Sequence, residues 1–217
     1  GETILKLKAR LWFVHRGVEK LAEGRPVADV LPLVERISGD TAVGHTLAFC
    51  LAVEEAVEWP VPPSAYPGRA ALLELERLYN HVTDIGALCN DVAHSTAHAH
   101  AQRIRERLLR LNAVTTGHRF LRGGIFPGGT HIMKLPEPAQ INDIAAQIAE
   151  VADIALHDRR VRERFTGTAV LTRQQAHDLG ALGYVARASG LHSDARTGHP
   201  FTDLTGVLTV PVQTGGD

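Results

Sequence analysis

The sequence has few cysteines, few aromatic residues and almost no net charge, and each scarcity excludes a class of protein. Cys50 and Cys89 are the two cysteines in 217 residues, too few for a disulfide scaffold, so we expect a reducing compartment. Aromatic residues make up 5% of the chain, which disfavours an all-β sandwich or barrel. Lys and Arg total 23 against 24 Asp and Glu, so the formal charge of −1 provides no field that attracts nucleic acid.

Long apolar runs and familiar catalytic motifs are also missing. The apolar stretch from Thr46 to Val57 is interrupted by Glu54 and Glu55, and it is shorter than the roughly 20 residues that span a bilayer. We find no nucleophile elbow, phosphate-binding loop, dinucleotide fingerprint or zinc-protease motif. We therefore expect no transmembrane segment in this chain. Because it begins with Gly1 and lacks an initiator Met, we interpret it as a fragment of a longer protein.

The residues that are present predict a mainly α fold, a bundle of long helices with a small β appendage from the two chain ends. Apolar residues make up 44% of the chain and recur every three or four positions. Leu72, Leu75, Leu78, Val82, Ile85, Leu88 and Val92 form one such stripe. Asp40 and Ser64 are candidate N-caps. We expect short helices within 15–37, longer ones over about 40–58, 64–93, 99–114 and 139–165, and a short one over 173–179.

Strand candidates lie near both ends of the chain. Residues 3–13 alternate apolar and polar side chains, and 184–188 and 206–212 are the other candidates. The Gly- and Pro-rich segment 121–129 is expected to be an irregular loop. We predict one domain, made of a strand remnant at 1–14, a helical bundle at 15–183 and an irregular or β segment at 184–217.

Histidines gather at the end of the predicted long helix. His94, His98 and His100 have offsets of four and two, and the first pair therefore shares one helical face at metal-ligand spacing. No carboxylate or Cys stands at a fixed ligand offset in this segment, so a solvated junction between helices is the preferred interpretation.

A small-residue turn lies between two predicted helices, at Ser38-Gly39-Asp40-Thr41 and Gly44-His45. Exposed N–H groups at the start of the second helix there could hold an anion or a carbonyl, and a tight turn with an Asp cap is the alternative. Arginines beside Gly-containing turns could meet an anionic partner surface or a quinone head group, although a loop arginine is usually just solvated. They are Arg36, Arg122, Arg187 and Arg196.

Five segments, taken together and in order, resemble one family: the large subunits of energy-converting nickel-iron hydrogenases of the formate hydrogenlyase type and of NADH-quinone oxidoreductase, respiratory complex I. The segments are FVHRGVEKLAEG (13–24), ERISGDTAVGHTLAFCLAVEEA (35–56), LLELERLYNHVTDIGALCNDVA (72–93), GHRFLRGGIFPGG (117–129) and RASGLHSDAR (187–196).

The resemblance implies a degenerate member that lacks the first Cys pair. The hydrogenases carry Cys-Gly-x-Cys, which holds nickel, where this chain has Ser38 and Thr41, and hydroxyls are weak donors for soft nickel. Complex I large subunits also lack these thiolates and use the vacated space as part of a quinone pocket. Complex I usually has a Tyr at the position of Gly39, which donates a hydrogen bond to the quinone carbonyl, and Gly39 has no side chain that could replace this donor. No metal is therefore expected here, and the catalytic residues stay unknown.

The resemblance also implies the pocket candidates Ser38, Gly39, Thr41, His45, His81 and Asp91. For His81, burial between packed helices is an equally good interpretation. The family places the arginine that matches Arg36 near an iron-sulfur cluster of a neighbouring small subunit, where a cation raises the potential of the cluster.

For the whole complex, the resemblance implies an iron-sulfur small subunit and membrane subunits as partners, with no nucleic acid. The chain would lie on the cytoplasmic side of the membrane, attached through those partners. It would hold no cofactor of its own; quinone would bind in the full complex, and NAD, if used, would belong to other subunits. We expect the isolated chain to be inactive. The alternative is a non-catalytic scaffold or assembly subunit.

Overall fold

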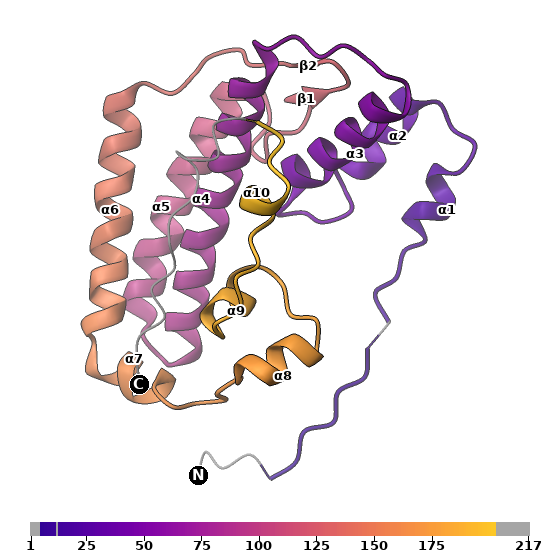
Figure 1. Cartoon of the computed structure of the whole chain (residues 1–217). Coiled ribbons are helices and arrows are strands. Elements are labelled where there is room, and N and C mark those ends of the chain that lie inside the picture. Colours follow the sequence, from indigo (N-terminus) through magenta and orange to yellow (C-terminus); the bar gives the residue numbers. More distant parts are fainter. Residues whose placement is uncertain (1–4, 12, 203–217) are drawn as a thin grey trace.

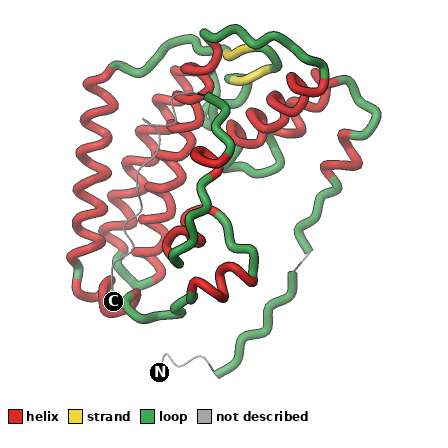
Figure 2. Tube along the Cα trace, in the orientation of Figure 1, coloured by secondary structure: helices red, strands yellow, loops and turns green. Residues whose placement is uncertain are grey.

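The computed structural model describes residues 5–11 and 13–202, and these fold mainly as helices (Figures 1 and 2). The mainly α prediction is therefore confirmed. In chain order the elements are α1 (Val18–Ala22), α2 (Val27–Val34), α3 (Ala42–Ala56), α4 (Ala65–Asp91), α5 (Ser95–Thr116), β1 (Ile125–Phe126), β2 (Gly129–Thr130), α6 (Pro138–His157), α7 (Arg159–Phe165), α8 (Arg173–Asp178), α9 (Gly183–Ala188) and α10 (Ala195–Gly198).

Three long helices, α4, α5 and α6, lie side by side and form the main bundle (Figure 1). Tyr79 and Val82 of α4, Ile104 and Leu108 of α5, and Ile144 of α6 belong to one buried cluster. A second cluster joins α3 and α4 to the segment around the β-hairpin, and its buried members are Val43, Leu47, Cys50, Leu72, Leu75, Leu121 and Ile125. Helix α4 contributes to both clusters and is the central element of the fold.

The predicted stripe on α4 is largely confirmed. Leu72, Leu75 and Val82 are buried, and Leu78 and Ile85 pack against the bundle core. Leu88 is the exception, because half of its surface (51%) is exposed near the end of the helix. Ser64 is the N-cap residue of α4 as predicted, although its side chain makes no capping hydrogen bond.

Within residues 5–11 and 13–202, the β structure does not come from the segments near the chain ends. Residues 5–11, inside the predicted strand at 3–13, have no strand partner, and 184–188 lies in α9; the candidate at 206–212 lies outside the described residues. The hairpin forms instead in the expected irregular loop, where Ile125 pairs with Thr130 and Phe126 with Gly129. Pro127 and Gly128 occupy its turn, and the φ of 85° at Gly128 suits glycine.

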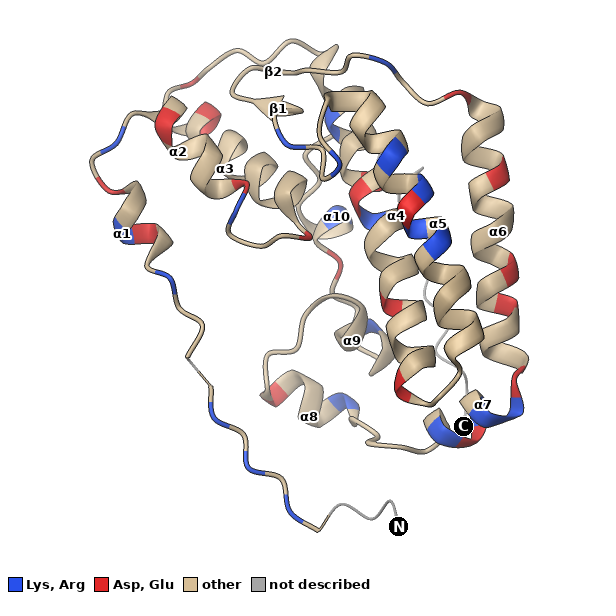
Figure 3. Ribbon diagram, turned by 180° about the vertical axis from the view of Figure 1, so that it is seen from behind, with Lys and Arg blue, Asp and Glu red and all other residues tan. Residues whose placement is uncertain are grey.

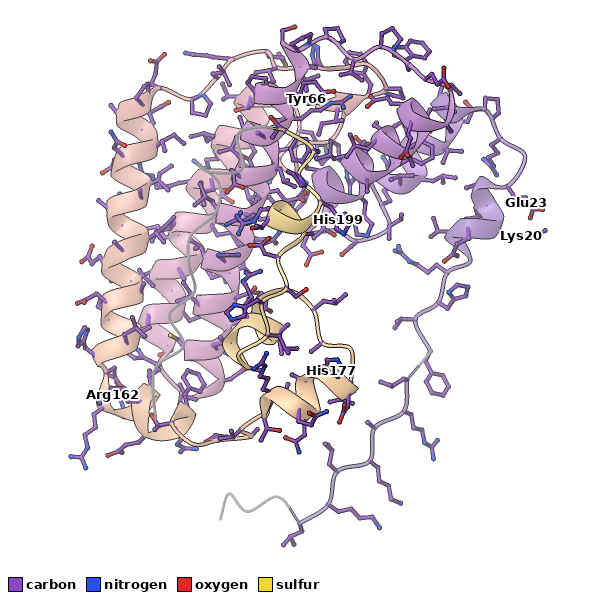
Figure 4. The ribbon with its side chains drawn as sticks, viewed as in Figure 1. Lys20, Glu23, Tyr66, Arg162, His177 and His199 are labelled. Carbon is purple, nitrogen blue, oxygen red and sulfur yellow. The ribbon has the colours of Figure 1, made fainter. Side chains whose placement is uncertain are left out.

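Helix ends also differ from the prediction at Asp158. The expected helix at 139–165 is two helices, α6 and α7, because the Asp158 carboxylate accepts hydrogen bonds from the N–H groups of Arg160 (2.8 Å) and Val161 (3.2 Å) and starts α7. Most charged residues are at least partly exposed, and Figure 3 marks their positions along the ribbon. Lys20 of α1 and Glu23, the residue that follows α1, form an exposed pair that points away from the bundle (Figure 4) and contributes little to stability.

Candidate functional site

The loop with the predicted site residues, 38–41, leads into α3, and a residue far along the chain fixes this helix start. Glu76 of α4 accepts hydrogen bonds from the backbone N–H groups of Val43 (2.6 Å) and Gly44 (2.8 Å). The N-cap position belongs to Thr41, whose side chain makes no capping bond, and not to Asp40 as predicted. A carboxylate from another helix replaces the local cap, and it suits the positive end of the α3 dipole.

Glu76 is a buried carboxylate with an altered pKa. Its side chain is buried between α3 and α4, and no side-chain cation is paired with it among the described residues. Burial raises its pKa to about 7, the hydrogen bonds from Val43 and Gly44 oppose this rise, and the nearby charge of Asp40 adds to it. Glu76 is therefore a group that can change protonation near neutral pH next to the candidate site.

Two further side chains of α4 hold the loop by hydrogen bonds to its backbone. The Tyr79 hydroxyl and the Asn80 amide both donate to the backbone carbonyl of Asp40, at 2.6 and 2.7 Å. The Tyr79 ring is buried in the bundle core, and burial, together with the charges of Glu76 and Asp40, raises the pKa of its hydroxyl. The hydroxyl therefore stays protonated and acts as a fixed donor.

Within the loop, the polar side chains contact one another. The Ser38 hydroxyl donates to the Asp40 carboxylate. The Nδ1 atom of His45 lies 2.9 Å from the Thr41 hydroxyl and 2.8 Å from the Thr41 carbonyl oxygen. A proton on Nδ1 satisfies that carbonyl and leaves Nε2 of the neutral ring as an acceptor. Gly39 is exposed, and a Cβ built on it would meet no atom within 4 Å.

These donors do not fit a nickel centre. Ser38 and Thr41 supply hydroxyl oxygens that already bond within the loop, whereas nickel of this kind needs thiolates. Across residues 5–11 and 13–202, no group of three His, Cys, Asp or Glu side chains is placed to hold a metal ion. Cys50 and Cys89 are buried, and burial raises the pKa of the Cys50 thiol to about 12.

The other predicted residues are spread along the chain. Arg36 is exposed beside the loop and donates to the carbonyl of Pro32, the preceding turn of α2. His81 is exposed on another face of α4 from Tyr79, and loss of hydration, followed by the charge of Arg77, lowers its pKa. Asp91 ends α4, twelve residues after Tyr79, which is about 18 Å along the helix. The structure brings Ser38, Gly39, Thr41 and His45 together and places His81 and Asp91 apart from them.

The histidine cluster at the start of α5 serves the helix junction. Nδ1 of His94 accepts from the N–H of Ala97 at 3.3 Å and so caps α5, while its Nε2 lies 3.4 Å from the Asp158 carboxylate. Nδ1 of His98 lies 3.0 Å from the carbonyl of Gly86. His100 is exposed. Of the other histidines, His177 lies on α8 and His199 follows α10, so they belong to separate elements (Figure 4).

A second buried ionic group, which sequence reasoning missed, joins α3, α4 and the hairpin. The guanidinium of Arg69 forms a bidentate ion pair with the Glu54 carboxylate, donating one hydrogen bond to each carboxylate oxygen. It also donates to the carbonyl of Phe126 at 3.2 Å. Glu54 also accepts from the N–H of Gly128 at 2.7 Å. Both side chains are buried; burial opposes ionisation of Glu54, but Arg69 and Gly128 outweigh it and lower its pKa.

Comparison with known proteins agrees with this architecture. Residues 91–217 match the family model described as respiratory-chain NADH dehydrogenase, 49 Kd subunit. The chain belongs to this family. Formate hydrogenlyase subunit 5 of Escherichia coli K12 is 33% identical over 98% of the chain and 38% of its own length. An NADH-quinone oxidoreductase subunit of Trichlorobacter lovleyi is 30% identical over 93% of the chain and 53% of its own length.

A solved structure of the same fold comes from the membrane-bound sulfane sulfur reductase, an archaeal respiratory membrane complex. Its matching chain superimposes with a TM-score of 0.83 at 28% identity, over 95% of our chain and 57% of that chain. The chain thus spans between about two fifths and three fifths of the relatives it matches. These relatives are themselves subunits of a formate hydrogenlyase, of an NADH-quinone oxidoreductase and of an archaeal respiratory membrane complex. In its described part, no helix is long and apolar enough to cross a membrane.

Proposed function

We propose that this chain is part of the large subunit of a membrane-associated redox complex. In this complex, residues 38–45 line a quinone-like pocket without a nickel-iron centre; they comprise the loop 38–41 and the first turn of α3 and are called the loop 38–45 below. Ser38 and Thr41 carry the proposal: they are hydroxyl residues on a loop that four hydrogen bonds from α4 hold in place. A loop held in this way keeps its shape when the neighbouring parts of the complex assemble around it.

The chemistry of the loop supports a neutral, hydrogen-bonding ligand. His45 has Nε2 as a hydrogen-bond acceptor, and no atom lies within 4 Å of a Cβ built on Gly39. Glu76, with a pKa of about 7, binds the backbone at the start of α3. Nε2 of His45, as an acceptor, can orient the ring of the reduced quinol form by accepting a hydrogen bond from its hydroxyl, while the electrons that reduce the ligand would come from the iron-sulfur cluster of a partner small subunit. Arg36, exposed beside the loop, is the residue we assign to the side of that cluster.

The partners and location follow from the same proposal. An iron-sulfur small subunit and membrane subunits would surround the chain, and it would attach through them, peripherally, on the cytoplasmic side of the membrane. Quinone would bind only in the full complex, and any NAD would be used by other subunits. The isolated chain is then expected to be inactive.

A scaffold role is the second candidate, and one observation favours it. The hydroxyls of Ser38 and Thr41 are both engaged within the loop, with Asp40 and with His45. A loop whose polar groups are satisfied internally needs no ligand. In that case the chain would assemble the complex without binding a redox molecule.

The deciding experiment uses the full-length protein purified with its small subunit. Binding of a quinone analogue, measured by calorimetry, is expected to weaken at least tenfold in His45→Ala and to stay unchanged in His100→Ala, the exposed control. No binding by the intact complex would favour the scaffold, and stoichiometric nickel in that complex would overturn both candidates.

A further inference from the structure

The structure contains an apolar groove with a positively charged rim on the side of the bundle away from α3. It lies between α5, the connecting segment 134–136 and the start of α6, and has a volume of about 420 Å³. We call it the α5–α6 groove, lined by Arg107, Arg110, Leu111, Val114, Thr115, Lys134, Leu135, Pro136, Gln140 and Ile144. None of these residues belongs to the loop 38–45 or to its anchors.

The lining combines an apolar floor with an excess of positive charge. Three of its residues are basic and none is acidic, although the whole chain is close to neutral. Arg107 pairs with Asp143 and Arg110 with Glu106, but both carboxylates lie outside the lining and both pairs are exposed, so they are weak. Lys134 has no hydrogen bond or ion pair with any described residue. Figure 3 shows several basic segments along α5 beside α6.

The groove is rigid and extends into exposed apolar surface. The N–H of Met133 donates to the carbonyl of Thr115 at 2.8 Å, which holds the connecting segment against α5, and a capping box at Glu137 fixes the start of α6. Val114, Leu135 and Met133 expose 57%, 58% and 65% of their surfaces. Exposed Met and Arg side chains beside an apolar hollow are typical of protein interfaces.

We propose that the α5–α6 groove is a docking surface for a segment of a partner subunit that inserts an apolar side chain between α5 and α6. That segment places carboxylates beside Arg107, Arg110 and Lys134. Charge complementarity selects an acidic segment, because all charged lining residues are basic. The inference rests on one part of the proposed function, that the chain belongs to a multi-subunit complex. It does not depend on what the loop 38–45 binds.

The first test places a photo-crosslinking amino acid at Val114 in the intact complex, with Leu156 on α6 as a control position that is 70% exposed. Mass spectrometry of the adduct from position 114 is expected to identify a segment of another subunit that contains Asp or Glu beside an apolar residue. An adduct with lipid, with the same chain or with a segment free of carboxylates would overturn the proposal, as would the absence of an adduct.

The second test removes the positive charges without reversing them. The triple variant Arg107→Gln, Arg110→Gln, Lys134→Gln is expected to weaken retention of the crosslinked partner at least tenfold, with a smaller dependence on salt. Arg159→Gln with Arg162→Gln, on the exposed surface of α7, removes two positive charges elsewhere; this control is expected to leave retention of the partner unchanged. Equal retention of the partner in the triple variant and in the α7 control would reject the groove as the docking surface. Loss of quinone-analogue binding with unchanged retention of the partner would count only against the proposed function.

Discussion

Glu76 on α4 accepts a hydrogen bond from the backbone N–H of Val43, 33 positions earlier in the chain, and thereby caps α3 from another helix. Removing this acceptor leaves the N–H groups of Val43 and Gly44 unpaired in a buried place. We therefore expect Glu76→Ala to lower the free energy of unfolding by about 2–4 kcal/mol, measured by urea denaturation. Glu74→Ala, two positions away and partly exposed, is the control and should cost less than about 1 kcal/mol.

The same carboxylate makes stability depend on pH. Because the folded-state pKa of Glu76 is about 7, above its ordinary value of 4.5, the folded protein holds this proton more tightly than the unfolded chain. The contribution of Glu76 to the free energy of unfolding is then full below about pH 4.5 and is lost as pH rises through 7.

We expect the stability difference between the natural protein and Glu76→Gln to narrow or reverse in favour of Gln as pH rises from 5 to 8, since the amide does not titrate. Parallel urea titrations at several pH values measure this difference. A difference that is constant over this range would show that Glu76 does not titrate there.

Gly39 is predicted to accept a large side chain. No atom lies within 4 Å of a Cβ built there, so Gly39→Tyr should change the free energy of unfolding by less than about 0.5 kcal/mol. Gly128→Ala is the contrasting control: its φ is 85° and the new Cβ would lie 2.8 Å from Nε1 of Trp59, so a loss above about 1 kcal/mol is expected. In the full complex, Gly39→Tyr should strengthen quinone-analogue binding if the proposed pocket is correct.

Replacing one partner of the buried Glu54–Arg69 pair is predicted to lower the free energy of unfolding strongly. Arg69→Met leaves the Glu54 carboxylate buried with only the N–H of Gly128, and should lower the free energy of unfolding by about 3–5 kcal/mol. The matched control Arg77→Met removes a partly exposed pair with Glu74 and should cost less than about 1 kcal/mol. If Arg69→Met were as mild as this control, the pair would not hold the hairpin.

Much of the fold follows from periodicity, because a helix that buries one face needs apolar residues every three or four positions. The stripe from Leu72 to Ile85 shows this directly. Two of the strand predictions failed for a related reason. Alternation at 3–13 indicates an extended chain but not a partner strand, and 184–188 is too short for periodicity to separate strand from helix. The hairpin at 125–130 depends on Pro127 and Gly128, and this pair of residues indicates a turn without showing that strands flank it.

For the site, the resemblance located the loop but not what holds it. Glu76 and Tyr79 occupy positions in the apolar stripe of α4, and a charged residue at a buried helical position was the available signal. Their partners, Val43 and Asp40, are backbone groups that any sequence would offer, so only the tertiary structure reveals the pairing. The roles of His81 and Asp91 remain predictions, and their places on α4 are away from the loop.

Capping from a distance also has a consequence for the order of folding. Helix α3 carries no acidic residue in its first turn and no local cap, so its first turn is marginal until α4 docks and brings Glu76 to it. The amides of Val43 and Gly44 should then exchange their hydrogens with solvent only when the two helices separate. Their exchange rates would report directly on how often this part of the protein opens.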